Sequence, residues 1–123
     1  MKKEFLDYIC SLHGYLIRIK EIHWSTDSDA EHKLCDDLLD ELGDLEDEFA
    51  ETAMGFGNKK IEVGELKPML PNAETLKPML KELQEETAVL KNKLNAIKEG
   101  GLNSILDDVL AFAQKYMYRA TQV

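Results

Sequence analysis

Residues 28–54 read SDAEHKLCDDLLDELGDLEDEFAETAM, and the fold class follows from this stretch. Its apolar side chains recur at steps of three and four residues, at Cys35, Leu38, Leu42, Leu45 and Phe49. That spacing is the period of an amphipathic α-helix. Ser28 and Glu31 form a Ser-x-x-Glu capping box, which marks a helix start. The stretch therefore predicts one long helix with a single apolar stripe.

Three other stretches have the same helical period, and none alternates like a strand. The stripe of the first consists of Phe5, Ile9, Leu12, Leu16, Ile19 and His23. That of the third helix consists of Leu76, Leu80, Leu83, Thr87, Leu90, Leu94 and Ile97. The stripe of the last consists of Leu102, Ile105, Leu106, Val109, Phe112, Ala113 and Tyr116.

The connections between these four helices are short, long and short, and the long one has about 18 to 20 residues. Short connections make neighbouring helices antiparallel, whereas the long one can run the length of a bundle. We therefore expect residues 1–123 to form a single all-α domain. Its expected architecture is a ferritin-like four-helix bundle with one long crossover between the second and third helices.

The 123 residues include 15 basic and 24 acidic side chains, which give a formal net charge of −9. Residues 28–54 hold 11 of the acids against the one cation Lys33, a balance of −10, so the rest of the chain carries +1. Phosphate contacts need a basic face, so this charge argues against direct DNA binding. The excess of negative charge therefore lies on one predicted helix, that of residues 28–54.

No apolar run approaches the roughly 20 residues that a membrane span needs. Glu4 and Asp7 interrupt the stretch where an export signal would be apolar. Cys10 and Cys35 are too few for a disulfide framework and are typical of reduced thiols. We therefore expect a cytoplasmic protein without a membrane partner.

The acids of the 28–54 helix lie opposite its apolar stripe, at Asp36, Asp40, Asp44, Asp47 and Glu51. Like charges three and four residues apart repel each other on a helix, and a bound cation would relieve that repulsion. Asp36, Asp40 and Asp44 are candidates for auxiliary metal binding or nucleation. A plainly solvated carboxylate is the alternative for each.

The first helix has a second apolar side, formed by Leu6, Cys10, His13, Ile17 and Trp24. A helix that is apolar on two sides of so small a domain indicates contact beyond its own bundle, and self-association is the natural hypothesis. We expect His13 at such an interface rather than on a metal.

His23 ends the first helix and His32 begins the second, while Asp47 and Glu51 are one helical turn apart. Imidazole and carboxylate together suit iron, manganese or zinc. The spacing of these four residues makes them candidate metal ligands.

The motif His23-Trp24, His32 and Asp47-Glu48-Phe49-Ala50-Glu51 resembles the ferroxidase signature of the Dps-type mini-ferritins. That signature runs His-Trp, His, and then Asp-Glu-apolar-Ala-Glu. The KYMYRA stretch at residues 115–120 is similar to the aromatic-Met-x-Arg-Ala ending of that family's last helix. The resemblance covers most of the chain.

The resemblance implies a ferroxidase whose subunits form twofold dimers and a hollow dodecameric shell. His23 and His32 would come from one subunit, and Asp47 and Glu51 from its twofold mate. Iron would enter as Fe²⁺, be oxidised there by peroxide or oxygen, and be stored as Fe³⁺, which protects against oxidative damage. Trp24 is a candidate electron donor next to the iron, or an anchor of the interface.

Two alternatives use the same residues. One is a non-enzymatic ferritin-like assembly, favoured by the interval of only nine residues between His23 and His32. The other is a metal-buffering or zinc-binding bundle, which would share the ligands without the redox chemistry, since zinc has none.

Overall fold

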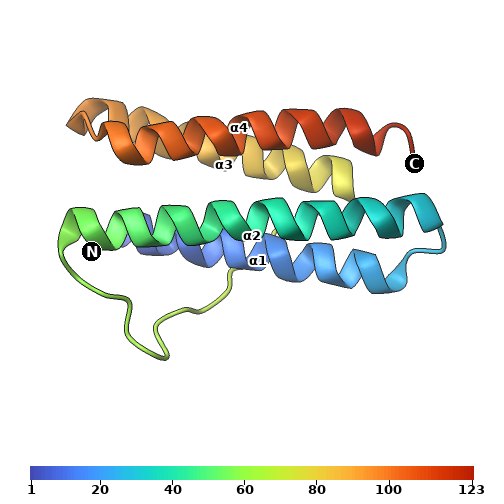
Figure 1. The fold of residues 1–123 in the computed structure, drawn as a ribbon, viewed down its shortest axis with the longest axis horizontal. Coiled ribbons are helices and arrows are strands. Elements are labelled where there is room, and N and C mark those ends of the chain that lie inside the picture. Colours follow the sequence, from blue (N-terminus) through green and yellow to red (C-terminus); the bar gives the residue numbers. More distant parts are fainter.

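Four α-helices make up the computed structural model, which describes residues 1–123 except for the side chain of Ile97. They are α1 (Lys3–Ser25), α2 (Asp29–Gly57), α3 (Leu76–Ile97) and α4 (Gly100–Ala120). The described backbone contains no strand. The predicted all-α four-helix bundle is therefore confirmed (Figure 1). The expected place of Ile97 on an apolar stripe lies outside the described side chains.

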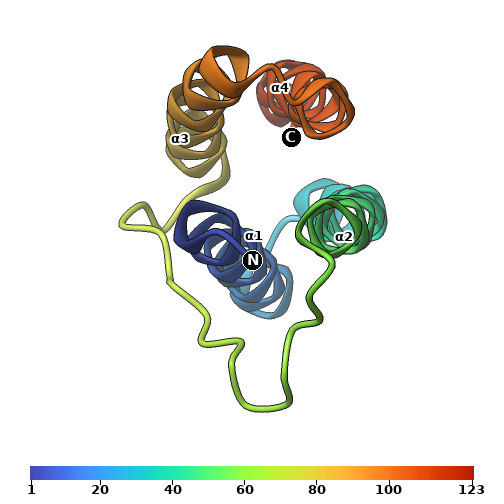
Figure 2. The same ribbon diagram turned by 90° about the vertical axis from the view of Figure 1, so that its left-hand side faces the viewer.

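The helices pack as two antiparallel pairs. Residues 26–28 join α1 to α2, and residues 98–99 join α3 to α4. The pair α1–α2 lies against the pair α3–α4, mainly through α2 and α4, while α1 touches α3 less extensively (Figure 2). The chain runs in the same direction along α2 and α3 (Figure 1).

The predicted apolar stripes meet in the middle of the bundle. Leu12, Ile19, Leu38 and Leu42 are fully buried there, as is Phe49. Leu16 and Leu45 are half-buried and pack against the edge of this core. Burial of these stripes supplies the main driving force for the fold.

Capping chemistry sets the start of α2. The Ser28 hydroxyl accepts a hydrogen bond from the backbone N–H of Glu31 at 3.1 Å, as the capping box predicts. This bond satisfies one of the free N–H groups at the helix start. The connection of three residues before it brings the end of α1 next to the first turn of α2.

Residues 58–75, which connect α2 to α3, are fastened to α1. The backbone N–H of Met69 donates a hydrogen bond to the carbonyl of Cys10 at 3.0 Å. The segment passes so close to Gly14 that a Cβ atom at that position would overlap the Met69 carbonyl. Glycine at position 14 therefore permits this contact between the connection and α1.

Candidate metal centre

His23 and His32 meet where α1 turns into α2. The Nδ1 atom of His23 lies 3.2 Å from the carbonyl oxygen of His32. The Nδ1 atom of His32 lies 3.0 Å from the carbonyl oxygen of His23. The two rings are stacked, with centroids 3.8 Å apart and an angle of 27° between their planes. The two candidate ligands from the motif are thus brought together within one chain.

These reciprocal bonds define which ring nitrogens are free. A carbonyl oxygen can only accept, so each Nδ1 carries a hydrogen, and in the neutral ring the lone pair is then on Nε2. Metal-binding histidines commonly donate their other ring N–H to a carbonyl in this way, which holds the ring in place. The carbonyl of His23 belongs to the last turn of α1, where no helical N–H is available. His32 therefore caps α1 and is oriented by the same bond.

Asp36 completes a three-residue cluster with the histidines. Its Oδ1 atom lies 3.4 Å from Nδ1 of His23, the same nitrogen that faces the His32 carbonyl. One ligand atom from each of the three side chains lies within 4.8 Å of the others. The His23 side chain is 11% exposed and that of Asp36 is 58% exposed. The cluster is therefore supported on one side and open to solvent on the other. Two nitrogen ligands and one oxygen ligand suit a divalent transition metal.

Asp36, which the sequence predicted as an auxiliary metal ligand, is the carboxylate that lies next to the histidines. It stands one helical turn after His32, so the interval of four residues between them was the available signal. His23, at the end of another helix, joins them because the connection between α1 and α2 is short.

Asp47 and Glu51 lie elsewhere on the same chain. Both are exposed on α2. Asp47, the nearer of the two, follows His32 by 15 residues, which corresponds to about 22 Å along a helix. One ion therefore cannot be bound by all four motif residues of a single chain, and only a second copy could supply these two carboxylates.

Trp24 lies beside the cluster on the surface. Its side chain is 71% exposed, and the Lys20 ammonium lies 5.5 Å from the ring centroid. The rest of the second apolar side of α1 is more covered than Trp24. Cys10, for example, is 6% exposed beneath the 58–75 connection, and Ile17 is half-buried. The expected outward apolar surface is thus concentrated at the end of α1 that carries His23.

His13 does not belong to the cluster. Its Nδ1 atom lies 2.9 Å from Oε2 of Glu46 on α2. Burial raises the pKa of the Glu46 carboxyl, while the hydrogen bond and the charge of His13 act in the opposite direction. The pair joins α1 to α2 about midway along the hairpin.

Two further groups of acids on α2 differ in whether they have partners. On the side facing α4, Arg119 binds Asp37 at 2.8 Å, and Lys115 binds Glu41 at 2.9 Å. The hydroxyl of Tyr116 also donates to Glu41 at 2.8 Å. The KYMYRA stretch thus supplies cations and a hydroxyl to this side.

The outward side of α2 has no such compensation. We call its four acids Asp40, Asp44, Asp47 and Glu51 the outward acid row. Among the described side chains, no basic group lies within ion-pair distance of this row. The negative charge predicted from the sequence is therefore partly neutralised by α4, while the outward acid row is exposed.

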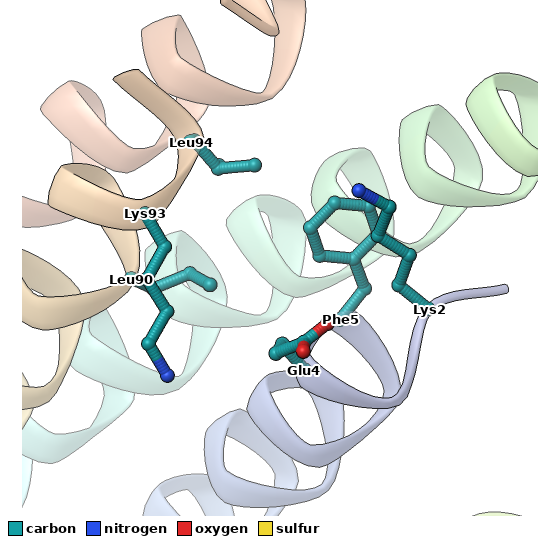
Figure 3. A pocket seen from close by; sticks show the side chains of 6 residues that line it. All are labelled: Lys2, Glu4, Phe5, Leu90, Lys93 and Leu94. Carbon is teal, nitrogen blue, oxygen red and sulfur yellow. The ribbon is translucent and has the colours of Figure 1, made fainter. Parts of the chain in front are cut away.

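A pocket of about 220 Å³ lies at the opposite end of α1 from His23, between α1 and α3 (Figure 3). Its lining residues are Lys2, Glu4, Phe5, Leu90, Lys93 and Leu94. Phe5 is 18 residues from His23, which corresponds to about 27 Å along the helix. None of its lining residues is a histidine or cysteine, so this pocket is unrelated to the candidate metal centre.

Comparison with known proteins gives a family and a phage relative. The model of a family of unknown function (DUF5856) matches residues 23–120, a range that includes His23, His32, Asp36 and the outward acid row. The chain is 27% identical over 121 residues to an uncharacterized 14.6 kDa protein in the mobD-ri intergenic region of Enterobacteria phage T4. That alignment covers 93% of this chain and 84% of the phage protein.

No solved structure matches the chain. Within the described residues, none of the helices combines the length and the apolar character that crossing a membrane requires.

Proposed function

The chain belongs to the family of unknown function DUF5856, and since that membership assigns no chemistry, we propose a function from the site: uptake and oxidation of Fe²⁺ at a centre shared by two copies of the chain. The reciprocal bonding of His23 and His32 beside Asp36 carries this proposal. It brings two imidazoles and a carboxylate together at the junction of α1 and α2, and this ligand set suits Fe²⁺.

The spacing along α2 supports a contribution from a second copy. Glu51 follows Asp36 by 15 residues, the same interval that separates Asp47 from His32. If two α2 helices lie antiparallel about a twofold axis, one register therefore sets Glu51 of the second copy beside His32 and Asp47 of the second copy beside Asp36. The same register completes both centres of the dimer.

The proposed chemistry is a balanced electron transfer from iron to an oxidant. Each of two Fe²⁺ ions loses one electron, and the two electrons cleave the O–O bond of one hydrogen peroxide molecule to give two hydroxide ions. Dioxygen is the alternative oxidant. The outward acid row would attract Fe²⁺ to this face, because clustered negative charge raises the local concentration of a cation.

The wider architecture belongs to the same proposal. A ferritin-like bundle with a crossover between α2 and α3 is supported by the 18-residue connection 58–75 and by the common direction of the two helices (Figure 1). A closed shell assembled from dimers would store the ferric product. Two free, buried thiols, Cys10 and Cys35, are consistent with a cytoplasmic location.

Anaerobic loading with Fe²⁺ followed by hydrogen peroxide tests the oxidation. The parent protein should form ferric product, measured by ultraviolet absorbance, faster than a protein-free blank, and His32→Ala and Asp47→Ala should lose this acceleration. His13→Ala is the matched control, because His13 lies outside the cluster and should retain the parent rate. A parent rate equal to the blank would overturn the oxidation and leave metal binding without turnover as the alternative.

A further inference from the structure

Resting on the proposed shared centre, we propose that a divalent transition metal controls whether two copies of the chain pair at all. In this account the metal-free chain is held apart from its copies by the outward acid row. An ion bound at the His23–His32–Asp36 cluster compensates this repulsion and holds the two α2 helices in the antiparallel register described above. The metal is then a switch for assembly as well as the substrate.

Repulsion between metal-free copies follows from the charge on α2. The outward acid row has no ion pair among the described side chains, whereas Asp37 and Glu41 on the same helix are paired with α4. The antiparallel register brings one row against the other. Exposed charges within a Debye length of each other still interact at physiological salt, so two uncompensated rows would oppose close contact.

Coordination chemistry supplies the compensating attraction. The cluster offers three ligand groups, and one of them, Asp36, is 58% exposed. Zinc requires at least four ligands, and iron or manganese commonly takes more. Carboxylates of the second copy can fill the open positions, so each ion would be bound by both copies and would add positive charge where the rows meet.

An apolar contact is available once the charges are balanced. Trp24, next to His23 in the sequence, is 71% exposed, and Ile17, two helical turns before it on α1, is half-buried. Aromatic side chains are favoured anchors of protein interfaces. This surface would add buried area to the contact between the two copies. It would not select one register of the two α2 helices, and that selection comes from the shared metal.

Sedimentation velocity with different ions at one ionic strength tests the switch. The parent chain should be monomeric in EDTA and in Mg²⁺, and should become a dimer or larger assembly with stoichiometric Zn²⁺. Mg²⁺ carries the same charge but prefers oxygen ligands, so it controls for simple screening. His32→Ala and Asp47→Asn should stay monomeric in Zn²⁺, and circular dichroism should show that both remain helical.

Glu48→Ala is the matched control, because Glu48 is an exposed acid next to Asp47 that points about 100° further round the helix. It should assemble with Zn²⁺ like the parent. Equal assembly in EDTA and Zn²⁺, equal assembly in Mg²⁺ and Zn²⁺, or a Zn²⁺-dependent dimer that survives Asp47→Asn would each overturn the inference.

Zinc makes this test independent of the oxidation, because Zn²⁺ has no redox chemistry. Zn²⁺-dependent assembly in a protein that does not accelerate iron oxidation would keep the switch and remove the ferroxidase. Iron oxidation by a protein that assembles without metal would keep the ferroxidase and remove the switch.

Discussion

His23 and His32 each bind the backbone carbonyl of the other, at 3.2 Å and 3.0 Å between ring nitrogen and oxygen. The two contacts fasten the end of α1 to the start of α2. In the neutral rings they leave the lone pair on each Nε2. The same two histidines therefore hold the turn between the helices and form the candidate metal centre.

Removing one imidazole should weaken metal binding and loosen this turn. We expect His32→Ala to reduce the affinity for Zn²⁺ by at least about tenfold, since a ligand and the hydrogen bond that orients His23 are both lost. Loss of that bond should also cost roughly 1 kcal/mol of unfolding free energy. Isothermal titration calorimetry and urea unfolding in EDTA measure the two effects. Equal weakening of Zn²⁺ binding by His13→Ala and His32→Ala would contradict a role of His32 as a ligand.

Glu41 should make the fold sensitive to acid. Burial alone would raise the pKa of its carboxyl, but hydrogen bonds from Lys115 and Tyr116 outweigh it and lower the pKa below its usual range. A carboxyl with a lowered pKa stabilises the fold above its unfolded pKa near 4.5, and this stabilisation is lost as the pH falls through the folded value.

Urea midpoints of the parent and Glu41→Gln, compared from pH 6 down to pH 3, measure this contribution. The parent should be more stable than the variant at pH 6, by less than about 1 kcal/mol because the ion pair is solvent-exposed, and the difference should shrink on acidification. A constant difference over the whole range would mean that the charge of Glu41 does not matter.

Gly14 and Gly43 should respond in opposite ways to alanine. A Cβ at position 14 would overlap the Met69 backbone, so Gly14→Ala should destabilise the fold by roughly 2 kcal/mol or more or displace residues 58–75. A Cβ at position 43 meets nothing within 4 Å, so Gly43→Ala should stabilise α2 by about 0.5–1 kcal/mol. Urea unfolding in EDTA compares them. Equal effects would contradict the close approach at Gly14.

The helices and their buried faces could be predicted because hydrophobic periodicity records which side of a helix is covered. Leu38, Leu42 and Phe49 follow that rule directly. Ser28 was predictable as a cap because its chemistry is local. The burial of Cys10 by residues 58–75 could not be predicted. These residues have no helical period, and their path depends on tertiary contacts such as that of Met69 with Cys10.

The sequence indicated which residues could belong to the candidate site, but not how their side chains contact one another. The motif identified His23 and His32, and the short connection explains why they meet. Their reciprocal carbonyl bonds depend on the exact dihedral angles of the turn, which no spacing encodes. The partner of His13 was also missed, since Glu46 is 33 residues away and reaches it only when α1 and α2 pack.

The proposed register places Gly43 near the twofold axis, within two residues of the midpoint between Asp36 and Asp47. Gly43→Cys should therefore form a disulfide with its own copy under mild oxidation in Zn²⁺, because two such residues would come within bonding range. Gln114→Cys, exposed on α4, is the control and should not. Non-reducing gel electrophoresis measures the linked dimer. Equal linking of both variants would exclude this register.

Mixing two inactive variants tests the shared centre most directly. His32→Ala retains Asp47 and Glu51, and Asp47→Ala retains both histidines, so a mixed dimer has one intact centre. Neither variant alone should accelerate Fe²⁺ oxidation by peroxide. In an equimolar mixture about half of the parent activity should return if only mixed dimers form, as the metal switch requires, and about a quarter if the variants pair at random, since each mixed dimer has one working site of two. A mixture as inactive as its components, with mixed dimers shown to be present, would contradict a centre shared between two copies.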